Sequence, residues 1–135
     1  MNETSSCGCG SAPALIFPCS GAADTGAVTD RAGRKLSAEG AGKMACLAGI
    51  GGRVSGIMKS AEAASVLLAI DGCPLDCAKK TLELAGLKNI RHLRVTDMGF
   101  VKGKTPVADE AIDKAVEKGW EMLREFTSRT GGCGC

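Results

Sequence analysis

The chain of 135 residues is poor in aromatic side chains and in histidine. It has no tyrosine, one tryptophan, three phenylalanines and one histidine. That histidine, His92, lies beside Arg91 and Arg94 in a segment where polar and apolar residues alternate, so we expect it at the surface of an edge strand. A single histidine placed there argues against a Ser-His-Asp arrangement. The 19 glycines and many alanines favour tight turns and helices packed closely on a sheet.

Long apolar runs are also missing from the sequence. The first apolar stretch, residues 12–17, is too short for a signal peptide or a membrane span. The residues before it, Met1-Asn2-Glu3-Thr4, include no basic side chain. The sequence therefore predicts a cytoplasmic protein with no membrane partner. Thiols stay reduced in that compartment, where clustered cysteines more often bind metal or do redox work than form disulfides.

Neither sign of charge dominates. The formal net charge is +2, and basic and acidic residues alternate along the chain. This balance gives no electrostatic footprint for a nucleic-acid partner. The length suits one domain that can bury its own core.

Cysteines, in contrast, are abundant, and three of them are evenly spaced. Cys19, Cys46 and Cys73 lie 27 residues apart, and each closes a short apolar run. This spacing suits one strand, one helix and two short loops, the repeat of a parallel α/β sheet. Residues just past the carboxyl ends of parallel strands meet at one edge, where ligands bind. Cys77 follows Cys73 by about one helical turn and would face the same way, so four thiols are expected to converge.

The pattern of apolar residues predicts a three-layer α/β/α fold with about four parallel strands and a cysteine-rich site at the carboxyl edge of the sheet. The expected domain is residues 13–127, between two Gly-rich tails at 1–12 and 128–135. Its expected strands are Ala14–Phe17, Lys43–Cys46, Ser65–Ile70 and Ile90–Val95. The first expected helix is Ala22–Glu39, and the second is a short one that carries Val54, Ile57, Met58 and Ala61. The third is Pro74–Ala85, with Cys73 as its N-cap. The fourth begins with Thr105 and Pro106, and its apolar stripe consists of Ile112, Ala115, Val116, Trp120, Leu123 and Phe126.

Four convergent thiols predict a metal site. Zinc binds thiolates at about 2.3 Å in a tetrahedron, which requires neighbouring sulfur atoms to lie roughly 3.8 Å apart. Four nearby cations, Lys43, Arg53, Lys79 and Lys80, could offset the negative charge of such a site. Two alternatives remain open: the same thiols could hold an iron–sulfur cluster or act as a dithiol redox centre. Buried cysteines that only fill space are the structural alternative, which the convergence of four disfavours.

Three segments of the chain resemble the DGC-domain family, small bacterial and archaeal proteins described as zinc-binding and marked by an Asp-Gly-Cys tripeptide and four cysteines. The matching segments are Phe17-Pro18-Cys19-Ser20-Gly21-Ala22-Ala23-Asp24, Met44-Ala45-Cys46-Leu47-Ala48-Gly49-Ile50-Gly51-Gly52 and Ile70-Asp71-Gly72-Cys73-Pro74-Leu75-Asp76-Cys77-Ala78-Lys79-Lys80. The similarity spans about residues 14–125 and includes residues 93–100. It implies metal binding through Cys19, Cys46, Cys73 and Cys77, and it implies no established reaction.

The remaining polar residues near these cysteines favour structural roles. Asp71 and Asp76 are expected to act in a turn and in helix capping, and Asp24 suits the positive end of its helix. Cys46 and Arg53 bracket a glycine-rich loop, which we expect to be a tight turn exposing Cys46. This loop has one residue more than an anion-binding phosphatase loop, so a phosphatase is disfavoured. The sequence carries no hydrolase or transferase signature, although redox activity is possible.

Both tails carry a Cys-Gly-Cys unit, formed by Cys7 and Cys9 at one end and Cys133 and Cys135 at the other. Their symmetry suggests either thiols that pass metal or electrons to the core site or a second metal site. Taken together, the sequence predicts a zinc-binding protein with a role in metal or thiol sensing, trafficking or structural stabilisation. The candidate partners are a metal ion and a redox or protein partner.

Overall fold

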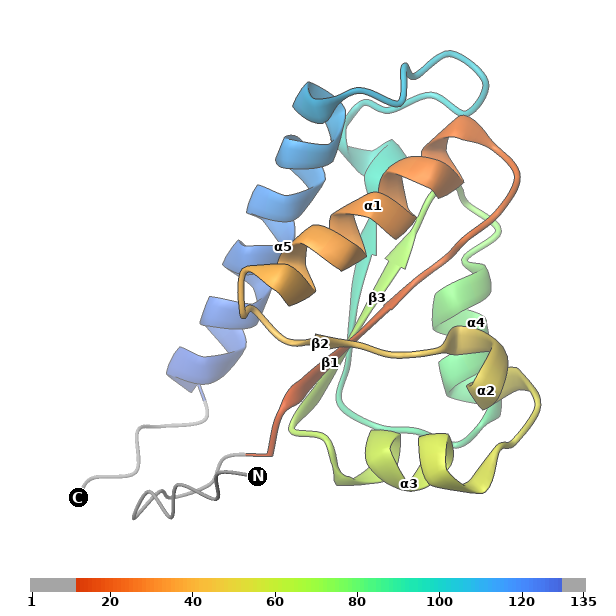
Figure 1. Ribbon diagram of the computed structural model, residues 1–135, viewed down its shortest axis with the longest axis vertical. Helices are drawn as coiled ribbons and strands as arrows, with labels where there is room; N and C mark the ends of the chain where they lie inside the picture. The colour runs from red at the N-terminus through yellow and green to blue at the C-terminus, as the bar shows by residue number, and fades with distance from the viewer. Residues whose placement is uncertain (1–11, 130–135) are drawn as a thin grey trace.

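A computed structural model describes residues 12–129 as a four-stranded sheet with helices on both faces (Figure 1). The strands are all parallel and lie in the order β2-β1-β3-β4. The elements are, in chain order, β1 (Ala14–Pro18), α1 (Asp24–Ala38), β2 (Lys43–Met44), α2 (Leu47–Gly51), α3 (Ser55–Ala63), β3 (Val66–Asp71), α4 (Cys77–Leu84), β4 (Ile90–Arg94), the 3-10 helix η1 (Val95–Met98) and α5 (Asp109–Arg129). The predicted α/β class and the number of strands are confirmed.

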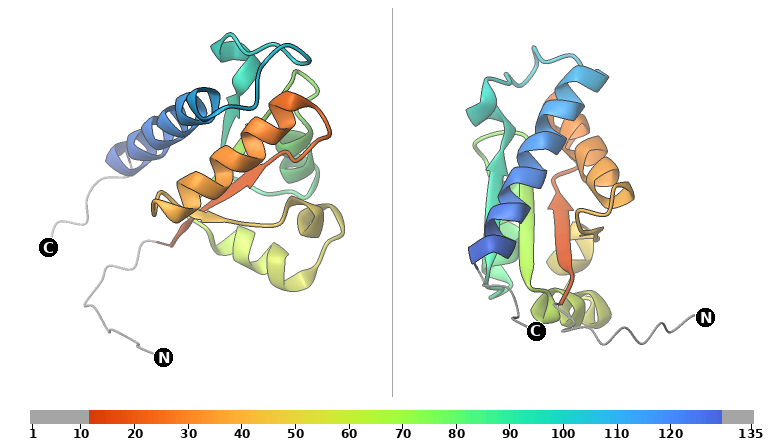
Figure 2. Two further views of the ribbon diagram at one scale, coloured as in Figure 1. Left: turned by 45° about the horizontal axis from the view of Figure 1, so that its top comes forward. Right: turned by 90° about the vertical axis from the view of Figure 1, so that its left-hand side faces the viewer.

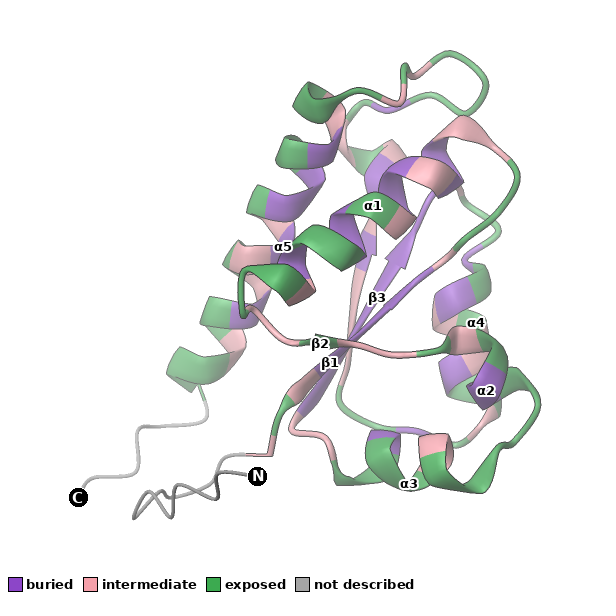
Figure 3. Cartoon of the chain, viewed as in Figure 1, coloured by how far each residue is buried: buried purple, intermediate pink, exposed green. Residues whose placement is uncertain are grey.

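The helices form two layers, one on each side of the sheet (Figure 2). Helices α1 and α5 pack on one face, and α2, α3 and α4 lie on the other. The central strand β3 is buried along its whole length, as expected for a parallel strand that is covered on both faces (Figure 3). Strand β4 is an edge strand, as its alternating sequence predicted.

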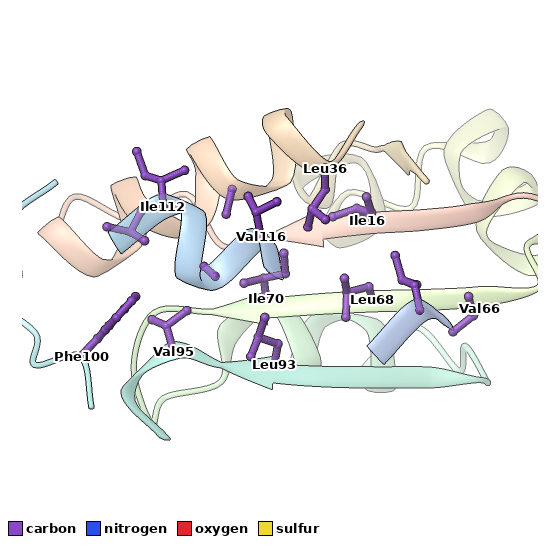
Figure 4. Packing of buried hydrophobic residues seen from close by; sticks show 14 residues of the cluster. Ile16, Leu36, Val66, Leu68, Ile70, Leu93, Val95, Phe100, Ile112 and Val116 are labelled. Carbon is purple, nitrogen blue, oxygen red and sulfur yellow. The ribbon is translucent and has the colours of Figure 1, made fainter. Parts of the chain in front are cut away.

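Each face of the sheet has its own apolar core. Ile16, Leu68 and Ile70 point toward α1 and α5, where they meet Leu36 and Val116 (Figure 4). Leu15, Phe17 and Leu67 point the other way and pack with Ile50 and Leu82. Burial of each such side chain stabilises the fold by about 1.5–3 kcal/mol, so mainly aliphatic side chains stabilise both cores.

The last helix buries the predicted stripe but begins later than expected. Ile112, Ala115, Val116 and Leu123 are buried, and Trp120 and Phe126 pack against the same core. The predicted start at Thr105 and Pro106 is wrong, because the Thr105 hydroxyl bonds to the backbone of Val101 within the preceding loop. The helix starts at Asp109 and continues to Arg129, two residues past the predicted end of the domain.

Two further boundaries differ beside the cysteines. The segment after Cys46, expected to be a tight turn, forms the short helix α2, and β2 is only two residues long. The predicted helix start at Pro74 is also wrong: α4 begins at Cys77, so Cys73 is not its N-cap. The reason is Asp76, whose left-handed backbone (φ 54°) interrupts a helical path immediately before Cys77.

None of the helices within residues 12–129 combines the length and the apolar character that crossing a bilayer requires.

Candidate functional site

Three of the four predicted ligands line one pocket at the carboxyl edge of the sheet. The pocket has a volume of about 210 Å³, and its walls include Cys19, Cys73 and Cys77. Cys19 follows β1, Cys73 lies in the turn after β3, and Cys77 is the first residue of α4. The parallel sheet therefore brings together thiols that are up to 58 residues apart in sequence.

The fourth cysteine, Cys46, lies in an adjacent hollow. It is exposed, immediately precedes α2, and lines a neighbouring pocket of about 470 Å³. Ser20 and Leu47 border both pockets, so one wall separates Cys46 from the other three thiols. The expected convergence of four thiols is thus seen for three of them within a single pocket, and Cys46 lines the adjacent one.

The four core sulfur atoms are not close enough together for one metal ion to contact all of them. All four cysteines are free thiols. Among residues 12–129, the set of three or more potential ligands whose atoms lie within 4.8 Å of one another consists of Asp71, Asp76 and His92 and contains no cysteine. No three of the four thiols are therefore at the separation that a single ion requires.

Polar groups contact two of the sulfur atoms. The backbone N–H of Gly72 donates to Cys19 Sγ at 3.2 Å, and Thr29 Oγ1 lies 3.4 Å from the same sulfur. The Lys102 ammonium lies 3.9 Å from Cys73 Sγ. Cys19 Sγ therefore has a backbone N–H donor beside it, and Cys73 Sγ has an ammonium group beside it.

Lys102 is a site residue that the sequence analysis did not identify. Two of the expected cations are engaged elsewhere: Arg53 donates to the carbonyl oxygens of Ile50 and Leu84, and Lys79 pairs with Glu83 at 3.9 Å. Arg53 therefore does not bracket an anion with Cys46. Lys102 lies 29 residues from Cys73 in a polar loop, and no local pattern in the sequence links the two.

The loop that carries Lys102 is attached to the start of α1 by Asp24. The Asp24 carboxylate accepts backbone N–H bonds from Gly103 at 2.8 Å and Thr105 at 3.0 Å, as well as from Thr25 at 2.7 Å. These bonds, led by the one from Gly103, hold the pKa of Asp24 below its ordinary value, although partial desolvation opposes them. Asp24 does occupy the first turn of α1, as predicted, and it also fixes a distant loop at the pocket.

The glycine of the Asp-Gly-Cys tripeptide is required by close backbone packing. A Cβ atom on Gly72 would lie 2.9 Å from the backbone nitrogen of Gly26 and 2.9 Å from the carbonyl carbon of Thr25. The turn after β3 therefore packs directly against the first turn of α1. This contact sets the distance between the segment that carries Cys73 and the segment that follows Cys19.

Asp71, Asp76, His92 and Arg94 form a polar cluster beside the turn that carries Cys73. Asp71 accepts the N–H groups of Ala78 at 2.8 Å and Lys79 at 3.1 Å, so its predicted capping role at α4 is confirmed. The expectation that His92 is a surface residue is wrong: its side chain is only 16% exposed, and Nε2 lies 2.9 Å from Asp71 Oδ2. The sequence pattern missed this contact because β4 turns that face toward α4 instead of toward solvent.

The second aspartate of the cluster forms an ion pair instead of a helix cap. Asp76 makes no side-chain capping bond, and both of its oxygens accept hydrogen bonds from the Arg94 guanidinium. The bond from Arg94 holds the pKa of Asp76 below its ordinary value, with a smaller contribution from the charge of His92, while burial opposes the shift. The same pair raises the pKa of Arg94, so the two side chains remain charged.

Comparison with known proteins identifies the class of the chain. Residues 15–119 match the model of the DGC domain, and the chain belongs to this family. It is also similar to the anaerobic and virulence modulator AnvM of Pseudomonas aeruginosa, with 31% identity over 88 residues that cover 65% of this chain and 67% of that protein. No solved structure matches the chain.

The two Cys-Gly-Cys units lie outside the described residues. The hypotheses that they transfer metal or electrons, or form a second metal site, concern those residues.

Proposed function

We propose that this chain binds one zinc ion through Cys19, Cys46, Cys73 and Cys77 and acts in metal or thiol sensing or trafficking. The observation that carries the proposal is that three thiols from separate segments line one pocket, with a backbone N–H and an ammonium group next to two of their sulfur atoms. The DGC-domain membership and the matching cysteine set support it.

Binding a single ion would require the thiols to move closer together. The sulfur atoms of a tetrahedral zinc site lie roughly 3.8 Å apart, whereas no three of the four core sulfur atoms lie within 4.8 Å of one another. Cys46 is exposed and lines the adjacent pocket, so it is the thiol that we expect to move. A zinc ion with four thiolates has no open position for water, so such a site would bind, sense or transfer the metal and would not catalyse hydrolysis.

An iron–sulfur cluster or a dithiol redox centre is the second candidate, and the spacing of the sulfur atoms favours the cluster. A cluster of several iron atoms holds its cysteine ligands farther apart than one ion does, so it would need less movement of the thiols. The similar protein is described as an anaerobic modulator, and a role linked to oxygen suits thiolates, which oxidise readily when they are accessible.

Metal analysis of protein purified without oxygen tests both candidates. We expect colourless protein with one equivalent of zinc, which Cys73→Ser loses and Ser20→Ala keeps, since Ser20 borders the same pocket without supplying a thiol. The four tail cysteines should be serine in every variant so that only the core is measured. Brown protein that contains iron would support the second candidate, and protein without any metal would overturn both metal proposals.

A further inference from the structure

Two residues of β4 reach across to the turn that carries Cys73. His92 and Arg94 are two positions apart on a strand, so their side chains project from the same face. That face looks toward α4, whereas Arg91 lies over the ring of Phe126 on the opposite face, at 5.8 Å from its centroid. His92 and Arg94 therefore hold residues 71–77 through Asp71 and Asp76.

His92 acts at the beginning of this turn. Its Nε2 lies 2.9 Å from Asp71, whose two oxygens also accept N–H groups from the first turn of α4. Asp71 is the last residue of β3 and is only 1% exposed. The carboxylate therefore joins the end of the central strand to the start of α4, and His92 fixes its orientation.

Arg94 acts at the end of the turn through Asp76, the residue between the turn and Cys77. The Asp76 N–H donates to the Cys73 carbonyl at 3.2 Å, and the Asp76 carbonyl accepts from the Lys80 N–H at 2.8 Å. Its backbone is left-handed, a conformation that a residue other than glycine keeps only when its surroundings hold it. The two-point bond from Arg94 holds this side chain, and His92 Nε2 lies 3.5 Å from its Oδ1. Asp97 lies 3.5 Å from the same guanidinium.

We propose that Arg94, assisted by His92, is a positioning residue that sets the separation of Cys73 and Cys77 for metal binding. This inference rests on the proposed function, because it concerns the same thiols. The four side chains are already paired with one another and with backbone N–H groups, so the cluster serves as a support for the thiol site and not as a cation site of its own. Partners that orient metal ligands typically contribute a factor of about 10–100 to metal affinity.

The test compares Arg94→Gln with Arg91→Gln, which removes the same charge from the opposite face of the same strand. Zinc affinity is measured by competition with a chelator, and the geometry of the site is measured from the thiolate-to-cobalt absorption after loading with Co²⁺. Unfolding of the metal-free proteins by urea is followed separately. We expect Arg94→Gln to bind zinc about 10–100-fold more weakly and to change the cobalt spectrum, while Arg91→Gln keeps the wild-type affinity and spectrum.

A second variant covers the case in which Arg94→Gln does not fold. Arg94→Lys keeps the charge but cannot donate to both Asp76 oxygens in the same planar geometry, so it should also weaken zinc binding, by a smaller factor. Wild-type affinity and spectrum in a folded Arg94 variant would overturn the inference and leave the proposed function standing. A wild-type protein that binds neither zinc nor cobalt would overturn the proposed function, and the inference with it.

Discussion

At the scale of single residues, the site depends on one position where no side chain fits. Gly72 packs so closely on the first turn of α1 that an added Cβ would meet backbone atoms of Gly26 and Thr25 at 2.9 Å. Backbone atoms cannot move aside as the end of a flexible side chain can. The Asp-Gly-Cys tripeptide therefore combines a helix-capping carboxylate, a close backbone contact and a thiol in three consecutive residues.

Gly72→Ala is expected to destabilise the fold by about 1–3 kcal/mol, the usual range when a side chain is forced into a packed interior. Urea unfolding measures this change. Gly56→Ala is the matched control, because Gly56 lies within α3 with nothing within 4 Å of the added Cβ. The control should be as stable as the wild type or about 0.5–1 kcal/mol more stable. Equal stabilities for Gly72→Ala and wild type would show that the turn can move away from α1.

The four core cysteines could be found from the sequence because their chemistry and spacing are visible there. The residues that support them could not be found in the same way. Lys102, His92 and Arg94 reach the cysteine turn from positions at least 15 residues beyond Cys77, and their own neighbours in sequence suggest an exposed loop and an exposed strand face. Only the pairing of β4 with β3 brings His92 and Arg94 to Asp71 and Asp76.

At the scale of elements, periodic apolar patterns predicted the strands and the long helices, whereas local backbone geometry decided the ends. The stripe of α5 and the buried run of β3 follow directly from side-chain burial. The start of α4 does not, because the left-handed Asp76 is held there by Arg94 from another strand. The start of α5 was misplaced for a similar reason, since Thr105 is held in a loop by Asp24.

The attachment of the Lys102 loop to α1 is expected to depend on pH. The folded pKa of Asp24 lies below its unfolded value, so the carboxylate stabilises the fold above the unfolded pKa of about 3.9 and loses this effect as the pH falls through the folded value. Asp24→Asn should therefore lower the thermal midpoint at pH 7. The difference from wild type should shrink steadily below pH of about 3.9.

Asp30→Asn provides the control for this measurement, because Asp30 lies on the same helix and pairs with the exposed side chain of Arg34. Because solvent screens a pair whose arginine is 68% exposed, the pair contributes little. The thermal midpoint of Asp30→Asn should therefore stay close to the wild-type value at both pH 7 and pH 3. A difference between Asp24→Asn and wild type that is the same at pH 7 and pH 3 would mean that the charge of Asp24 does not hold the loop.

At the scale of the whole molecule, the two ends of the described chain lie away from the thiol pocket (Figure 1). Ala12 and Pro13 line a pocket of about 220 Å³ together with Leu123 and Phe126 of α5, at the edge where the strands begin. The six residues of β3 place the opposite edge, with the core thiols, roughly 20 Å away. The described chain therefore begins at the edge of the sheet opposite the core thiols.

X-ray absorption at the zinc edge tests the central claim most directly, on the chain in which Cys7, Cys9, Cys133 and Cys135 are replaced by serine. We predict one bound zinc surrounded by four sulfur atoms at about 2.3 Å. A coordination sphere of mainly nitrogen and oxygen atoms, or a chain that binds no zinc, would contradict the assignment of Cys19, Cys46, Cys73 and Cys77 as its ligands.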